Sequence, residues 1–174
     1  EVFALHLMTR HRSAMEPEGH EGIADFLHRL LPRGTDDRTR EEIQAELRSL
    51  GASLTTAGDP TVPFGDFYTS RLYSYIRLEC LRDKASQAVA VLADMVLDPR
   101  LADEDVEDVR GRLLDILSYR FAVPGTVASR ELACELYGDA LSADVYGSRS
   151  SIKAVTRGDL FAFHGRYFVG SNLI

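Results

Sequence analysis

The sequence predicts an α+β fold in which helices pack on one antiparallel-rich sheet. Strand-length segments with alternating or apolar character lie mostly in the first half of the chain, and at least two of them form a hairpin-like pair. Apolar residues recur at helical spacing in other segments, and these dominate from about residue 85 onwards. This arrangement, without regular alternation of strand and helix, favours α+β over a parallel doubly wound sheet.

Three segments are expected to form the sheet. Residues 2–10, VFALHLMTR, have the apolar content and the length of a strand. Residues 52–57 are expected to form a short strand, and residues 67–79 alternate between polar and apolar side chains. Between them, GDPTVPFGD (residues 58–66) contains two prolines and two glycines, which predicts an exposed and mobile loop.

Helices are expected over the amphipathic segments. The first runs from His20 to Leu31, and Pro32 with Gly34 ends it. Thr39 is expected to cap a second helix over residues 40–51, with Glu42 as its capping-box partner. Further helices are predicted at residues 85–99, 102–121, 125–138, around Ser151 and at 156–168, the last capped by Thr156 with Asp159 in its first turn.

Length and composition indicate one globular domain over residues 1–174. The chain is 45% hydrophobic and 27% charged, and no apolar run approaches the roughly 18–20 residues of a membrane span. A net charge of −7 argues against nucleic-acid binding through a basic surface. Cys80 and Cys134 lack the spacing of a zinc or redox motif and are expected to be buried free thiols. The strand-like start and the abrupt end indicate a fragment of a longer chain whose first strand is missing, so no compartment is predicted.

Three polar residues on the first predicted helix raise the question of a site. Asp25, His28 and Arg29 lie at i, i+3 and i+4 and therefore share one helix face. Helices present metal ligands and a base from such a spacing, but a guanidinium stays protonated and has no lone pair to donate to a metal. Arg29 therefore cannot be a metal ligand. The alternative to a site is that the three residues form an ordinary solvated helix face.

The segment around these residues resembles the zinc-site helix of the pitrilysin/insulinase family of metallopeptidases. HEGIADFLHRLLPRGT stands where that family has an inverted motif, His-x-x-Glu-His, followed by a hydrophobic pair and a Lys-Gly-Thr-like turn. The resemblance continues in TREEIQAELRSLGASLTT, in ASQAVAVLADMVLDPRLADEDVEDVRGRLLDIL and in YGSRSSIKAVTRGDLFAFHGRYFVGSNLI, in that order. It covers nearly the whole chain and implies the fold of a pitrilysin or mitochondrial processing peptidase domain.

The resemblance also assigns positions to the site. In the family, two histidines and a later glutamate bind zinc, and the glutamate of the motif activates the zinc-bound water. Asp25 stands at the first ligand, His28 at the catalytic glutamate, Arg29 at the second ligand and Asp115 at the third, while Asp108 falls where a further acidic residue supports the site. All the catalytic positions therefore differ from the family pattern.

These differences predict a catalytically incompetent domain that holds no zinc. The resemblance implies that it contributes to the substrate chamber or the dimer of a zinc-dependent peptidase, with other pitrilysin-like domains of the same chain or an active homologous subunit as partners. Peptide is the expected ligand, and neither nucleic acid nor a membrane is expected as a partner. Two alternatives stay open, namely an active zinc metalloendopeptidase with unorthodox ligands and a non-enzymatic binding or scaffold subunit.

Some side-chain contacts can also be predicted. If the family geometry holds, Arg29 takes the place of the zinc and bridges Asp25 and Asp115; the alternative is that it reaches solvent. Hydrolysis assisted by His28 without a metal is not expected, because no serine or cysteine accompanies it in this stretch. The remaining residues considered are expected to be core, packing or surface residues: His6, His11, His20, His164, Tyr68, Tyr73, Tyr75, Arg40, Arg110, Arg112 and Arg149.

Overall fold

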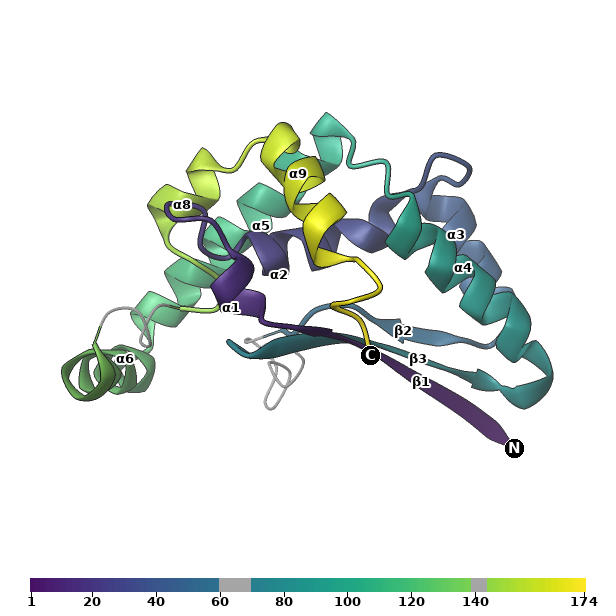
Figure 1. Cartoon of the computed structure of the whole chain (residues 1–174), viewed down its shortest axis with the longest axis horizontal. Coiled ribbons are helices and arrows are strands. Elements are labelled where there is room, and N and C mark those ends of the chain that lie inside the picture. The colour runs from purple at the N-terminus through teal and green to yellow at the C-terminus, as the bar shows by residue number, and fades with distance from the viewer. Residues whose placement is uncertain (60–69, 139–143) are drawn as a thin grey trace.

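The computed structural model describes residues 1–59, 70–138 and 144–174. It has two layers, a sheet on one side and helices packed over it, which confirms the predicted α+β class (Figure 1). The predicted loop at 58–66 lies largely outside the described residues, as does Tyr68. Among the described residues, no helix has both the length and the apolar content that a membrane crossing requires.

The sheet has three antiparallel strands in the order β1, β3, β2. β1 spans Val2–Arg10, β2 spans Ser53–Thr55 and β3 spans Tyr73–Leu81. β2 is shorter than predicted. β3 begins later than predicted, because residues 71–72 form a bend before it, and it continues two residues further, to Leu81. The end of the chain returns to β1, where Met8 and Ile174 exchange two backbone hydrogen bonds of 2.9 Å.

The helices follow the predicted segments with shifted ends, and their bounds are α1 Arg12–Met15, α2 Ile23–Leu30, α3 Arg40–Ser49, α4 Ala85–Leu97, α5 Asp103–Ala122, α6 Pro124–Tyr137, α8 Arg149–Ala154 and α9 Arg157–Tyr167, with the 3₁₀ turns η1 Leu31–Arg33 and η2 Arg82–Lys84. The short helix α1 was not predicted. The predicted helix from His20 begins only at Ile23, because Gly22 adopts a left-handed conformation with φ of 89°. A Cβ atom on Gly22 would also lie 2.5 Å from the backbone of Tyr146, so a side chain does not fit there.

Two predicted helix caps are confirmed. The Thr39 hydroxyl accepts from the Glu42 amide at 3.3 Å, and the Glu42 carboxylate accepts from the Thr39 amide at 2.8 Å. Thr156 and Asp159 form the same reciprocal pair at the start of α9. Each box satisfies two backbone donors that a helix start leaves open, which fixes where the helix begins.

The core lies between the inner face of the sheet and the helices, with α2 at its centre. Ile23, Phe26 and Leu27 of α2 are fully buried, and α2 contacts both α5 and α9. Burying side chains of this size stabilises the fold by about 1.5–3 kcal/mol each. Cys80 is buried as predicted, whereas Cys134 is only half-buried, on α6, whose residues from Pro124 to Leu136 are all at least partly exposed.

Candidate functional site

The candidate site is built on α2, where polar side chains are almost fully buried. Asp25 and His28 are each 2% exposed. Polar groups in such a position need hydrogen-bond partners, because burying an unpaired polar or charged group is costly. The partners found for Asp25, His28 and Arg29 therefore determine what this face of α2 can do.

Asp25 and Arg29 pair with each other along the helix. Arg29 Nε donates to Asp25 Oδ2 at 2.6 Å, and Arg29 Nη2 donates to the carbonyl oxygen of Gly58 at 2.6 Å. Burial alone would lower the pKa of Arg29, but the charge and the hydrogen bond of Asp25 raise it above its ordinary value. The guanidinium is therefore a permanent cation, held between a buried carboxylate and a backbone carbonyl.

The predicted bridge from Arg29 to Asp115 is wrong. Asp115 is exposed on α5, and no contact between it and Arg29 exists among the described residues. On α5 the buried side chains Leu113 and Leu117 face the core, so Asp115 between them points to a different side of the helix. The Nη2 group of Arg29 instead donates to the carbonyl oxygen of Gly58, which lies just beyond β2.

His28 faces the sheet and joins a buried cluster of hydroxyl groups. Its Nδ1 lies 3.0 Å from the carbonyl oxygen of Thr56, which can only accept, so Nδ1 carries the proton. Its Nε2 then accepts from the hydroxyl of Ser74 at 2.9 Å. Tyr167 and Thr9 complete the cluster, since the Tyr167 hydroxyl lies 2.7 Å from both Ser74 Oγ and Thr9 Oγ1.

Ser74, which lies outside the stretch of sequence around His28, meets its ring in the folded chain. The two residues lie 46 positions apart in the chain and meet only through the packing of α2 on β3. Burial, followed by the charges of Arg12 and Arg29, lowers the pKa of His28 from 6.5 to about 3. A base with so low a pKa removes a proton poorly, and Ser74 is only 4% exposed. These properties do not favour a nucleophile with its base.

Asp108 on α5 pairs with two arginines. Its Oδ2 lies 2.7 Å from Arg33 Nη1 and 3.1 Å from Arg112 Nε. Desolvation acts to raise the pKa of Asp108, but the contacts with Arg33 and Arg112 outweigh it and lower the pKa below its ordinary value. One carboxylate oxygen of Asp108 thus contacts two guanidinium groups.

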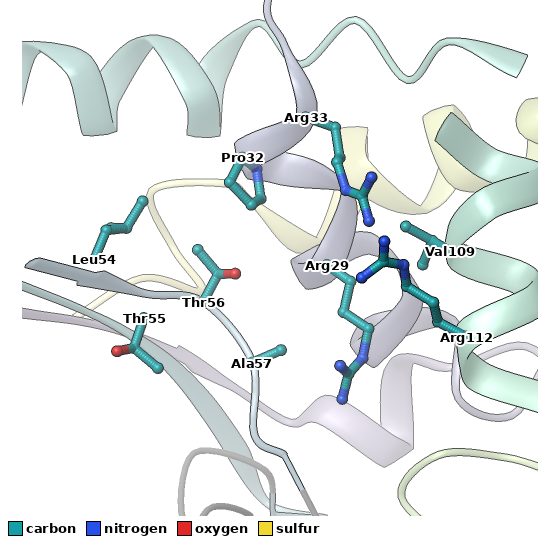
Figure 2. Close-up of a pocket in the computed structure, with 9 residues that line it drawn as sticks. All are labelled: Arg29, Pro32, Arg33, Leu54, Thr55, Thr56, Ala57, Val109 and Arg112. Atoms are coloured by element: carbon teal, nitrogen blue, oxygen red, sulfur yellow. The ribbon is translucent and has the colours of Figure 1, made fainter. Parts of the chain in front are cut away.

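These arginines and Arg29 line a cleft of about 320 Å³ (Figure 2). Its walls come from α2, η1, α5 and the segment from Leu54 to Ala57. Sequence reasoning did not single out Arg33 and treated Arg112 as a residue of a solvated helix face. The only signal for Arg33 was its place in the Lys-Gly-Thr-like turn, and Arg112 gave none, because its proximity to Arg33 depends on how α5 packs beside α2.

The five predicted site residues are therefore not gathered at one point. Asp25 pairs with Arg29, His28 points toward the sheet, Asp108 pairs with Arg33 and Arg112, and Asp115 is exposed. Among the described residues, no group of three or more His, Cys, Asp or Glu side chains is placed to hold a metal ion.

The donor set on α2 does not fit zinc. Zinc takes neutral imidazole, thiolate or carboxylate ligands. Arg29 offers no lone pair, and both ring nitrogens of His28 are engaged by Thr56 and Ser74. Asp25 already accepts from the Arg29 guanidinium.

Comparisons with known proteins agree with the fold. The mitochondrial-processing peptidase subunit beta of Dictyostelium discoideum is 26% identical over 164 residues, which cover 93% of this chain and 33% of that protein. An uncharacterized zinc protease of Mycobacterium leprae is 27% identical over 154 residues, covering 88% of this chain and 32% of that protein. The chain thus spans about a third of the length of these relatives.

Solved structures show the same architecture. A crystal structure described as a peptidase M16 inactive domain from Pseudomonas fluorescens superposes with a TM-score of 0.85 at 23% identity, covering 99% of this chain and 40% of that chain. A putative M16-like peptidase from Alicyclobacillus acidocaldarius gives a TM-score of 0.79 at 22% identity, covering 99% of this chain and 39% of that chain. The profile of Insulinase (Peptidase family M16) matches residues 4–119. With the two-layer fold and the α2 segment in place, this match shows that the chain belongs to peptidase family M16, the insulinase family.

Proposed function

We propose that this M16 domain is catalytically incompetent and contributes a wall of the substrate chamber, or one half of a dimer, to a zinc-dependent peptidase. Its partners in this role are other M16 domains of the same chain or an active homologous subunit. The observation that carries the proposal is the ion pair between Asp25 and Arg29, at the two positions where the family has zinc ligands. A carboxylate and a guanidinium that bind each other thus stand at the positions of two zinc ligands.

The surroundings of His28 support the same proposal. A general base must reach the water or the hydroxyl from which it takes a proton. His28 stands where the family has its catalytic glutamate, but it is buried and its ring nitrogens are engaged by Thr56 and Ser74. Relatives named as zinc proteases or processing peptidases, and a structural neighbour described as an inactive M16 domain, are consistent with a non-catalytic domain in a peptidase assembly.

Metal content tests the catalytic part of the proposal. The purified protein is incubated with zinc, passed through a desalting column and analysed by mass spectrometry for bound metal. We expect well under one zinc per chain. The matched control is the triple variant Asp25→His/His28→Glu/Arg29→His, which restores the family motif; its folding is checked by circular dichroism, and the result for the unmodified protein stands whether or not the variant folds. Stoichiometric zinc in the unmodified protein would favour the unorthodox peptidase instead.

Association with an active homologue tests the assembly part. We expect the protein to form a complex with an M16 subunit or domain that carries an intact His-x-x-Glu-His motif, measured by light scattering, and the peptidase activity of the mixture to exceed that of the active partner alone. The partners tested are M16 subunits from the source organisms of the relatives. A protein that folds normally but associates with none of them would favour a scaffold role unconnected with proteolysis.

A further inference from the structure

We propose that the cleft between α2, η1, α5 and the end of β2 binds a carboxylate group of a peptide through Arg33 and Arg112, with Arg29 in its wall. The preference for a carboxylate rests on the cleft alone. The assignment of that carboxylate to a peptide rests on the proposed function, because the family acts on peptides. The site lies next to α2, on which Asp25 and Arg29 stand at two ligand positions of the family, and its lining arginines come from α2, η1 and α5.

The positive and negative charges around the cleft are nearly balanced. Three guanidinium groups line it, while the carboxylates in direct contact with them are Asp25 on Arg29 and Asp108, shared by Arg33 and Arg112. Asp105 forms a further ion pair with Arg33, at 3.9 Å, and it also faces Arg100 at 3.8 Å. Asp59 acts on Arg29 from a longer range. These charges nearly balance, so the preference for a carboxylate rests on the unused N–H groups of the arginines and not on an excess of positive charge.

Hydrogen-bond donors are also left over. A guanidinium carries five N–H groups in a planar fork. Within the described residues, Arg33 uses only Nη1 and Arg112 only Nε in contacts with Asp108, and Arg29 uses Nε and Nη2. The guanidinium groups of Arg33 and Arg112 lie next to each other in the cleft (Figure 2). Their remaining N–H groups suit the two oxygens of a carboxylate, which guanidinium binds in a fork-to-fork geometry.

The shape of the cleft favours an acidic residue or a chain end over a bare ion. Its volume of about 320 Å³ is at the lower end of the roughly 300–1,000 Å³ of ligand pockets. Pro32, Leu54 and Val109 add apolar wall beside the arginines. Such a wall accommodates the methylene groups of a glutamate, or the apolar side chain that precedes a terminal carboxylate, while the arginines hold the charge.

The binding test uses the purified protein and four peptides that differ only in charge. The sequence is Ala-Ala-Leu-Glu-Leu-Ala-Ala with an acetylated N-terminus, made with central Glu or Gln and with a C-terminal carboxylate or amide. Binding is followed by ¹⁵N NMR of the arginine Nε–H signals. We expect the peptides with a carboxylate to bind about tenfold more tightly than the neutral peptide, which is the effect of one good charge-assisted hydrogen bond. Comparison of the two singly charged peptides shows whether a side-chain or a terminal carboxylate is the ligand.

Two arginine variants place the binding in the cleft. Arg112 is 60% exposed, so Arg112→Gln is not expected to disturb folding, and it should weaken the carboxylate peptide about tenfold. Arg48→Gln is the matched control, since it removes the same charge from an exposed site on α3 outside the cleft, and it should change the affinity less than about twofold. Arg112→Lys keeps the positive charge but loses the planar guanidinium group. Its affinity for the peptide should therefore lie between those of Arg112→Gln and Arg48→Gln.

Each other outcome overturns the proposal in a distinct way. Equal affinity of the charged and neutral peptides, or equal loss in Arg112→Gln and Arg48→Gln, would show that no carboxylate site exists in the cleft. Shifts of the Arg29 and Arg112 signals with propionate but with none of the peptides would show a cleft that takes small carboxylates and not peptides. Neither result bears on the zinc content or on association with an active subunit, so failure of this proposal is distinguishable from failure of the proposed function.

Discussion

Arg29 and Asp25 form an ion pair one helical turn apart in α2, with 2.6 Å between Nε and Oδ2, and the Asp25 side chain is only 1% exposed. An i, i+4 pair on a solvated helix contributes a few tenths of a kcal/mol. Here the carboxylate is enclosed by the core, so loss of its counterion leaves a buried charge without compensation.

Arg29→Ala should therefore destabilise the protein by about 3 kcal/mol, in the range measured when one partner of a buried pair is removed. The measurement is denaturant titration at neutral pH. Arg48→Ala is the control, because Arg48 is an exposed arginine on α3, and it should change the free energy of unfolding by no more than about 0.5 kcal/mol. Similar small effects of both substitutions would mean that the pair is screened by solvent.

Replacing both partners should be less harmful than replacing one. In Asp25→Leu/Arg29→Met no charge is left unpaired, and apolar side chains of comparable size often substitute for a buried ion pair at little cost. We expect this double variant to be more stable than either single variant, as measured by a double-mutant cycle. A double variant whose loss equals the sum of the single losses would show that the two side chains do not interact.

His28 should stay uncharged far below the usual pH. Its pKa is lowered from 6.5 to about 3, chiefly by burial and then by Arg12 and Arg29. In NMR spectra the imidazole should keep the Nδ1-protonated form down to the pH at which the protein unfolds. The same residue in denaturant should titrate near the ordinary value of about 6.5. Titration near 6.5 in the folded protein would show that the ring is open to water.

The lowered pKa of His28 also gives stability a pH dependence of known sign. Because the unfolded chain binds the proton more readily, the contribution of neutral His28 is fully present above pH 6.5 and is lost as the pH falls toward 3. The slope is up to about 1.4 kcal/mol per pH unit. Compared with His28→Gln, the unmodified protein should lose roughly 2 kcal/mol more between pH 6 and pH 4. A pH-independent difference between the two proteins would contradict this prediction.

Ser74→Ala should cost about 1–3 kcal/mol, because it removes the donor to Nε2 of His28 and leaves that buried nitrogen unpaired. Tyr167→Phe should cost less, since the Thr9 hydroxyl can still donate to Ser74 Oγ at 2.9 Å while Ser74 donates to His28. Ser49→Ala on the exposed face of α3 is the control and should be nearly neutral. Thermal unfolding followed by circular dichroism ranks the three variants, and equal melting temperatures for Ser74→Ala and Ser49→Ala would contradict a role for the hydroxyl cluster.

Much of the secondary structure could be predicted because it depends on neighbours in the chain. The apolar spacing in α2, the capping residues Thr39 and Thr156 and the strand β1 are local features, and the structure confirms them. The beginning of α2 was misplaced because the left-handed Gly22 packs against Tyr146, more than a hundred positions away, and that close approach is not visible in the local sequence.

The sequence by itself determined the fold class, the family and the chemical fact that Arg29 offers no ligand to a metal. Only the tertiary structure decided the partners of the polar side chains. Arg29 donates to Gly58 instead of Asp115, His28 meets Ser74, and Arg33 shares Asp108 with Arg112. The physical reason is the separation along the chain over which each effect acts. Periodicity and capping act over a few residues, whereas these contacts depend on how α2 is seated on the sheet and where α5 lies beside it, which the packing of the whole core determines.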